Sequence, residues 1–370
     1  MPNKILILEN GTVFKGEGFG SGERKIAEVV FNTSMVGYQE IFSDPAYLDQ
    51  FVVMTYPLIG NYGLTDEDFD SKGVFLAGFI VSEYNDLPSN FRTTMTLNES
   101  MCENNVVGIS GVDTRKLTRI IRDEGTMKAM ICDEGADIAE CVKEIKAYKK
   151  EGNEVKRVSR NNVRHCPTRN PKYSVVVIDC GIRNVSLRKM NDCGINLAIL
   201  PYNSTFEEVM NQKPDGVFIP NGPGDPSDVP ETVELVKKLK GKLPVFAIGL
   251  GLQIVSRAYG GKTLRMKKGH SGSNLPVKDV KTKEIEITSQ HHLYTVDASS
   301  LKNSGLEVTK INVIDGDVEG VEDAKNGIFA VAYQPENCAE PGYNHAVYQK
   351  FLENIKKFAG GKSNAEKNRY

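Results

Sequence analysis

The pattern of apolar and polar positions divides the chain into two parts. Over residues 1–150, short apolar runs separated by turn residues predict strands more often than helices. The Asn10-Gly11 pair predicts a tight hairpin, and the glycines between 16 and 22 predict that the second strand gives way to a loop. Strands are predicted over 5–8, 13–14, 28–31, 73–81 and 106–109, and helices after an N-cap at Asp113 or Thr114 and over 138–150. This part therefore predicts a β-rich α+β domain.

From residue 173 the pattern becomes an alternation of strands and helices. Such alternation predicts a parallel sheet with right-handed crossovers, and hence an α/β fold for the second part. Strands are predicted over 173–179, 196–200, 216–220, 244–248, 284–288, 306–313 and 328–333, and helices over 184–193, 205–211, 231–239, 252–259 and 343–358.

The segment between the two parts is polar and rich in Arg, Lys and Asn. Residues 151–171 end in Pro167 and Pro171, which favours a linker. Its basic residues could instead form a phosphate or nucleic-acid patch, but no aromatic residues interleave with them, so a solvated linker is the stronger interpretation. Residues 172–360 then form the second domain, and residues 361–370 a polar tail.

Residues 244–260 predict a strand, a sharp turn and a helix. This is the arrangement of a nucleophile elbow, which presents one side chain at the top of an α/β sheet. The residue at the apex is Gly249, which has no side chain. Three other segments (179–181, 221–225 and 334–336) also follow predicted strands, so all four are expected to share one cleft at the carboxyl ends of the sheet. The sequence thus predicts the scaffold of a covalent catalyst without the catalyst.

Composition argues against several classes of function but does not identify the function. The 370 residues carry a net charge of −2, which gives no field to attract nucleic acid or an anionic membrane. No apolar run approaches the roughly 20 residues of a membrane span, and the amino terminus does not predict a signal peptide. The sequence contains no C-x-x-C pair, which argues against a metal site. Reduced thiols and a cytoplasmic location are therefore expected. The seven cysteines are Cys102, Cys132, Cys141, Cys166, Cys180, Cys193 and Cys338.

Several longer motifs resemble the small, glutamine-amidotransferase subunit of carbamoyl-phosphate synthetase over essentially the whole chain. Three of them belong to the amino-terminal domain peculiar to that subunit, whereas other amidotransferases share only the second half. The motifs are FNTSMVGYQE at 31–40, TYPLIGN at 55–61, GVDTRKLTR at 111–119, NGPGDP at 221–226 and GHSGSNLPVKD at 269–279. The resemblance implies a flavodoxin-like class I amidotransferase domain and a large synthetase subunit as partner. That subunit would use ATP, Mg²⁺ and bicarbonate, with no cofactor in this chain.

The resemblance also implies a catalytic triad, most of which this sequence lacks. The family hydrolyses glutamine with a cysteine at the elbow, a histidine base and a glutamate that orients the base. Here Gly249 stands at the nucleophile position and Gln334 at the base position, and only Glu336 is retained. A neutral amide at Gln334 cannot accept a proton near neutral pH.

The positions implied for the glutamine pocket are partly changed as well. Ala46 stands where the family has a serine, Leu275 replaces a histidine, and Leu293 replaces a glycine and adds bulk where substrate should pass. The family's Gln-Asn-His-Gly motif reads Gln-His-His-Leu at 290–293. The implied pocket positions are Ala46, Gly222, Gly224, Leu250, Gln253, His291, Leu293 and Tyr294. The NGPGDP loop lacks the Lys-Ser/Thr of a phosphate cradle, so a rigid turn lining the cleft is favoured.

Other residues could in principle replace the missing groups. Cys180 and Cys338 follow strands near the predicted cleft, but neither lies on a strained turn, so both are interpreted as packed thiols. The neighbouring His291 and His292 point in opposite directions on an extended chain, which argues against one shared ion.

Three hypotheses remain at this stage. The first is a small-subunit homologue without glutaminase activity that acts as a structural or regulatory partner of a large subunit. The second is a sensor whose altered pocket binds another small ligand. The third and weakest is an enzyme with unfamiliar chemistry. The sequence does not distinguish the pyrimidine from the arginine pathway.

Overall fold

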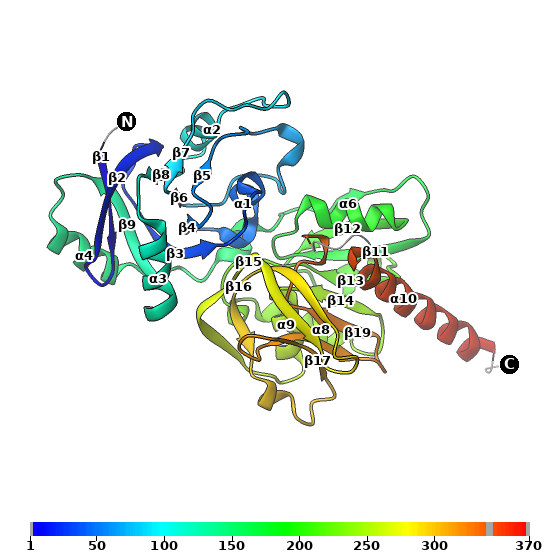
Figure 1. The fold of residues 1–370 in the computed structure, drawn as a ribbon. Helices are drawn as coiled ribbons and strands as arrows, with labels where there is room; N and C mark the ends of the chain where they lie inside the picture. Colours follow the sequence, from blue (N-terminus) through cyan, green and yellow to red (C-terminus); the bar gives the residue numbers. More distant parts are fainter. Residues whose placement is uncertain (1–2, 338–342, 368–370) are drawn as a thin grey trace. The chain divides into compact units, whose positions relative to one another are not determined.

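The protein is described here by a computed structural model that covers residues 3–337 and 343–367. Cys338 lies outside the described residues. The chain divides into two compact units (Figure 1): unit 1 contains residues 1–151 and 267–272, and unit 2 contains residues 152–266 and 273–370. Each unit has its own hydrophobic core. Within the described ranges, no helix combines the length and apolar character needed to span a membrane.

Unit 1 is built on a closed barrel of seven strands. Its strand order is β1-β2-β8-β6-β4-β3-β9, and alternate residues of each strand face the interior. In β1, Leu6 and Leu8 join the barrel core, whereas Ile5 and Ile7 pack outside it with helix α4. The strands are β1 (Asn3–Leu8), β2 (Val13–Gly20), β3 (Lys25–Asn32), β4 (Gln50–Met54), β6 (Gly78–Ile80), β8 (Val107–Ser110) and β9 (Met127–Asp133), and β5 (Leu58–Ile59) pairs separately with β7 (Glu83–Tyr84).

Three helices of unit 1, α2, α3 and α4, begin at residues whose side chains cap them. Asp113 caps α3 by accepting a hydrogen bond from the backbone N–H of Lys116 at 2.8 Å, which confirms the predicted helix start. Leu117 and Ile121 of this helix lie in the core of the barrel. The helices are α1 (Tyr38–Ser43), α2 (Leu97–Glu103), α3 (Thr114–Glu124) and α4 (Ile138–Ala147), with short 3-10 turns at Pro45–Tyr47 and Asp66–Asp68.

The predicted loop from residue 16 to 22 is wrong, because β2 continues to Gly20. Its glycines bring neighbouring backbones close together. A Cβ on Gly16 would lie 2.1 Å from the carbonyl oxygen of Ser110, and one on Gly20 would lie 2.5 Å from that of Val106. Glycine here allows close strand approach and does not interrupt the strand.

Unit 2 contains a ten-stranded sheet in the order β10-β12-β11-β13-β14-β19-β18-β17-β15-β16. The five strands β12, β11, β13, β14 and β19 are parallel, as the alternating pattern predicts, and the strands beyond β19 run antiparallel. The strands are β10 (Arg164–Cys166), β11 (Tyr173–Asp179), β12 (Ile195–Pro201), β13 (Gly216–Ile219), β14 (Val245–Ile248), β15 (Thr263–Asp279), β16 (Ile285–Val296), β17 (Glu307–Asn312), β18 (Val318–Asp323) and β19 (Ile328–Val331).

Two hydrophobic clusters cover the two faces of the parallel strands. Val176 and Ile178 of β11 belong to one cluster, and Val175 and Val177 to the other, because successive side chains alternate between faces. Helices α8 and α9 contribute to the first cluster, and α6 and α10 to the second. The helices are α5 (Glu154–Val158), α6 (Asn184–Asp192), α7 (Phe206–Asn211), α8 (Pro230–Leu239), α9 (Leu250–Ala258) and α10 (Tyr343–Lys367), with 3-10 turns at Pro226–Asp228, Ala298–Leu301 and Pro335–Asn337.

The structure also corrects three predictions about unit 2. The segment 151–171, predicted as a linker, contains α5 and β10, and β10 pairs with β12 at the sheet edge. Helix α10 continues to Lys367, through most of the predicted polar tail. The long strand β15 and the strand β18 were not predicted, because polar and charged residues dominate β15 and interrupt β18.

The core of unit 2 depends on Phe246, whose ring centroid lies 4.8–5.8 Å from those of Phe218, Phe329, Tyr348 and Phe351. We expect Phe246→Ala to lower the free energy of unfolding by about 3–5 kcal/mol, since it leaves a cavity among these rings. Phe91→Ala is the control, because the Phe91 side chain is 98% exposed. Urea denaturation should show less than about 0.5 kcal/mol for this control, and equal losses would contradict the assignment.

Candidate functional site

The predicted elbow is present between β14 and α9. Gly249 adopts φ 55° and ψ −117°, a conformation that residues with a Cβ rarely adopt. Its backbone N–H donates to the carbonyl oxygen of Val331 on the neighbouring strand β19 at 2.9 Å. A residue with a side chain would cost about 1–3 kcal/mol of backbone strain in this conformation. The elbow therefore has the backbone geometry of a nucleophile turn, and glycine adopts this geometry without strain.

The side chain of Asn221 fills the space beside Gly249. Its Oδ1 accepts a hydrogen bond from the backbone N–H of Leu250 at 2.9 Å, and its Nδ2 donates to the carbonyl oxygen of His291 at 3.2 Å. A Cβ built on Gly249 would lie 2.2 Å from Oδ1 and 2.4 Å from Cγ of Asn221. These distances are too short for non-bonded atoms, so Asn221 and a nucleophile at position 249 cannot both keep these positions.

The strand order brings the predicted cleft segments together. Asp179 ends β11, Asn221 follows β13, Gly249 follows β14 and Gln334 follows β19, and these four strands are neighbours. Because they are parallel, their carboxyl ends lie at one edge of the sheet. The prediction that these segments cluster is confirmed.

The two glycines of the 221–226 loop are needed for close packing. A Cβ on Gly222 would lie 2.0 Å from the carbonyl oxygen of Cys180, and Gly224 has φ +85°. Both positions therefore favour glycine for structural reasons. Their roles in a glutamine pocket stay a prediction.

The base position is occupied by a buried amide. Gln334 is 5% exposed, and its backbone N–H donates to the carbonyl oxygen of Ser289 at 2.9 Å. Its side chain is neutral and cannot take up a proton near neutral pH. The arrangement supplies no imidazole at this position.

Glu336, which the sequence predicts as the retained member of the triad, is bound by other residues. Its Oε1 accepts a hydrogen bond from Ser186 Oγ at 2.5 Å, and its Oε2 accepts one from the hydroxyl of Tyr348 at 3.4 Å. Arg183 Nη1 lies 3.8 Å from Oε1, and both side chains of this ion pair are buried. Burial, followed by the adjacent Glu336, raises the pKa of Tyr348 well above its usual value, so Tyr348 remains a hydrogen-bond donor. Glu336 thus ties α6 to α10.

The segment 290–294 is held by hydrogen bonds to its neighbours. Gln253 Nε2 donates to the carbonyl oxygen of Tyr294 at 2.8 Å, which anchors the segment to α9. The side chain of Leu293 is half-buried, and burial together with Asp225 raises the pKa of Tyr294 to about 12. Tyr294 therefore stays protonated at neutral pH.

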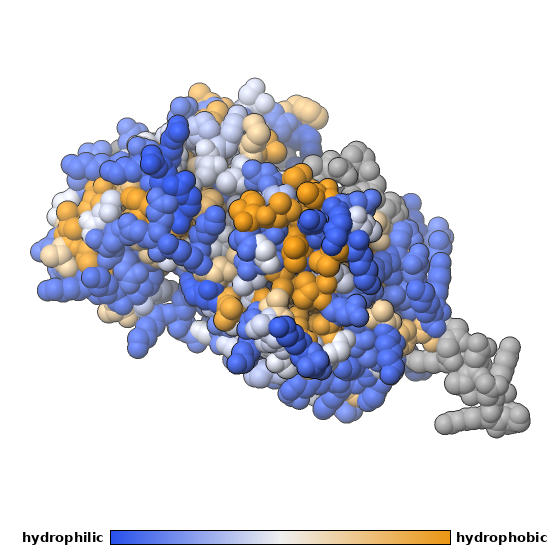
Figure 2. All heavy atoms as spheres, turned by 60° about the horizontal axis from the view of Figure 1, so that its bottom comes forward, coloured by the Kyte–Doolittle hydropathy of each residue, from blue (hydrophilic) through white to orange (hydrophobic). Residues whose placement is uncertain are grey.

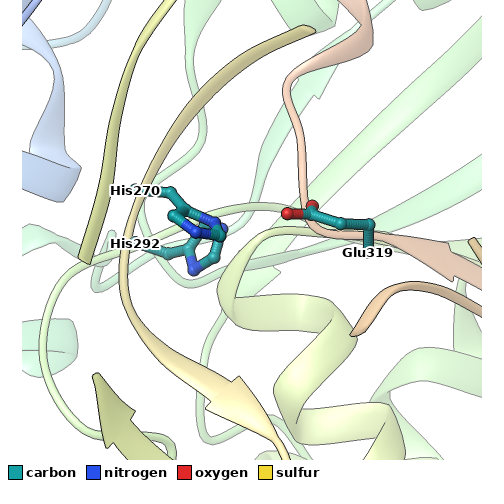
Figure 3. A group of neighbouring side chains, drawn as sticks. All are labelled: His270, His292 and Glu319. Carbon is teal, nitrogen blue, oxygen red and sulfur yellow. The ribbon is translucent and has the colours of Figure 1, made fainter. Parts of the chain in front are cut away.

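His292 makes hydrogen bonds through both ring nitrogens. Nδ1 lies 2.9 Å from the carbonyl oxygen of Tyr294 and Nε2 lies 2.9 Å from Gln290 Oε1. Figure 3 shows His292 facing the buried Glu319 of β18, with a ring nitrogen within 4.8 Å of a carboxylate oxygen. The same view labels His270, which lies on the part of β15 that belongs to unit 1.

The remaining candidate residues do not supply a replacement nucleophile. Cys180 is fully buried, and burial followed by the charge of Asp179 raises the pKa of its thiol, which keeps it protonated and unreactive. Ala46 is buried in unit 1, where its N–H donates to Asp44 Oδ1. The link between Ala46 and a glutamine pocket stays a prediction.

Comparison with known proteins identifies the family of this chain. Residues 6–131 match the family model for the carbamoyl-phosphate synthase small chain, CPSase domain, and residues 176–354 match that for glutamine amidotransferase class-I. The carbamoyl phosphate synthase small chain of Bacillus caldolyticus is 46% identical over 353 residues, which cover 95% of this chain and 96% of that protein. The chain belongs to the carbamoyl-phosphate synthase small-chain family.

Two further small chains are similar over almost their whole length. The small chain of Oceanobacillus iheyensis is 43% identical over 356 residues, covering 96% of this chain and 97% of that protein. The pyrimidine-specific small chain of Bacillus subtilis strain 168 is 44% identical over 350 residues, covering 95% of each. The β-rich first unit and the amidotransferase-type second unit of this small chain agree with the predicted fold class.

The role of Asn221 beside the elbow was not predicted from the sequence of this small chain. The NGPGDP motif drew attention to the loop, but the motif alone does not reveal where the asparagine side chain points. Two positions taken together could have predicted this contact. The glycine at 249 leaves a space, and a polar side chain that follows the adjacent strand can enter it. The partners of Glu336 were also missed, because Arg183 and Ser186 lie some 150 residues away in sequence.

We expect Gly249→Ala to lower the free energy of unfolding by about 2 kcal/mol more than Gly260→Ala. Both glycines have positive φ (+55° and +83°), but a Cβ at 260 meets no atom within 4 Å, whereas one at 249 displaces Asn221. The control therefore shares the positive φ but not the collision. Urea denaturation measures both, and equal losses would show that Asn221 yields without cost.

A second variant tests the network around Glu336. Glu336→Gln should lower the free energy of unfolding by about 3 kcal/mol or more, because it leaves the buried Arg183 without its carboxylate partner. Glu234→Gln breaks an exposed pair with Lys237 and should change stability by less than about 1 kcal/mol. A loss no larger than that of the control would mean that Glu336 has no structural role.

Proposed function

We propose that this small chain is a partner of a large carbamoyl-phosphate synthase subunit that does not itself hydrolyse glutamine. The observation that carries the proposal is Gly249 at the apex of the elbow, with Asn221 in the space of the missing side chain. Amide hydrolysis by this type of site requires a nucleophile and a base within hydrogen-bond reach of each other. Neither group is available at positions 249 and 334.

The state of the retained residues supports the same proposal. Glu336 is engaged with Arg183, Ser186 and Tyr348, where it stabilises the packing of two helices. The thiol of Cys180 is buried and protonated. Among the described residues of unit 2, the site therefore contains a rigid scaffold but no thiol–imidazole pair.

Two observations support a partner role: the length over which the chain matches other small chains, and hydrophobic residues exposed on its surface. The chain matches at least 95% of the length of three proteins named small chains. Ile285 and Ile287 on β16, and Val313 and Ile314 after β17, are 45–67% exposed. Figure 2 turns the lower part of Figure 1 toward the reader and shows a broad area of hydrophobic residues near the centre of the view, with smaller areas elsewhere. Bicarbonate, ATP and Mg²⁺ would be bound by the large subunit.

The test is carbamoyl-phosphate synthesis by the purified chain combined with its cognate large subunit. We expect no activity with glutamine as nitrogen donor, because the site cannot release ammonia. With ammonium, activity should be present and higher than that of the large subunit alone, because the small chain stabilises its partner. Glutamine-dependent activity would overturn the proposal and would require an unrecognised nucleophile.

A second candidate function is binding of a small ligand other than glutamine. It is favoured by the hydrogen bonds of Gln253 and His292, which hold the 290–294 segment in place. On such a frame, His291 and Leu293 would give the proposed pocket different lining groups. A thermal-shift screen of amino acids and nucleotides, with and without the large subunit, tests it. Absence of any response in both states would remove this candidate.

A further inference from the structure

We infer that the amide-binding position of the elbow is occupied by the chain's own amide, the carboxamide of Asn221. This inference concerns the same site as the proposed function and explains how that site is closed. It assigns a ligand class, a primary carboxamide, to the position between Leu250 and His291. The ligand is supplied internally.

The polarity of the position defines this ligand class. On one side the backbone N–H of Leu250 donates, and on the other the carbonyl oxygen of His291 accepts. A primary carboxamide offers one acceptor oxygen and one N–H donor in a single planar group, so it satisfies both. A carboxylate would present a second acceptor to the carbonyl of His291, and a dialkylated amide has no N–H to donate.

Burial increases the importance of the two hydrogen bonds made by the Asn221 amide. Asn221 is 3% exposed, so water does not readily replace its side chain as a partner for the two backbone groups. A buried backbone group without a partner is strongly destabilising. The amide of Asn221 therefore closes the position as long as Gly249 leaves room for it.

The inference predicts a second block to glutamine hydrolysis, separate from the lost nucleophile. The substrate's side-chain amide could reach the N–H of Leu250 only after Asn221 had left. Binding and chemistry are thus both prevented at the same elbow, by two different residues.

Chemical rescue with a small amide tests the inference. Asn221→Gly removes a group equivalent to one molecule of acetamide, and we expect the melting temperature to fall by roughly 4–8 °C. Acetamide should restore a large part of this loss in a saturable manner, as expected for a ligand that binds only the folded state. Wild-type protein should not respond, because its position is filled.

Matched controls identify the chemistry of the rescue. Acetate and N,N-dimethylacetamide, which are close to acetamide in size, should restore much less. Ser186→Gly also removes a buried hydrogen-bonding side chain from unit 2, but it leaves no amide-shaped space and should not respond to acetamide. An equal response to acetate, or in Ser186→Gly, would overturn the inference, as would no response to acetamide in folded Asn221→Gly.

A double-mutant cycle provides a second measurement if Asn221→Gly is too unstable for the rescue experiment. Asn221→Ala should destabilise the wild-type background more than the Gly249→Ala background, because a Cβ at 249 already displaces the amide. Additive effects would contradict the inference. Glutamine hydrolysis by the wild-type protein would instead contradict the proposed function, so the two failures are distinguishable.

Discussion

The space at the elbow of unit 2 admits only one of two groups. A strand, a sharp turn and a helix place position 249 against the side chain that follows the adjacent strand, and a Cβ and the carboxamide of Asn221 would lie only 2.2 Å apart. Because position 249 is glycine, the carboxamide enters and bonds to both neighbouring backbone segments. The amidotransferase fold surrounds this contact, and under the proposed function the fold is present without its chemistry.

This separation of fold from chemistry has a physical basis. The parallel strands, the helices on both faces and the aromatic cluster around Phe246 depend on apolar burial, which the substitutions at 249 and 334 leave untouched. Family membership, which follows from similarity over nearly the whole chain, therefore does not decide activity. Activity depends on a few side chains at one edge of the sheet.

The sequence predicted what is encoded locally. The alternation of apolar and polar residues predicted the five parallel strands, and Asp113 predicted the start of α3, because period and capping act over a few residues. Prediction from the sequence failed where contacts with a distant segment decide the local structure. The glycines of β2 predicted a loop, but they are needed because the backbone of Ser110 approaches the strand closely. The polar strand β15 was missed because its sequence has no apolar periodicity. The direction of the Asn221 side chain depends on a residue 28 positions later, which no local pattern conveys.

The network around Glu336 links the end of the sheet to two helices of unit 2. This carboxylate pairs with a buried arginine and accepts hydrogen bonds from side chains of α6 and α10. A cysteine introduced at 249 would require the Asn221 side chain to shift, and a histidine introduced at 334 would meet a carboxylate that already has other partners. Single substitutions at 249 or 334 would therefore disturb contacts that the folded chain already uses, so under the proposed function a change toward the family pattern would affect stability as well as chemistry.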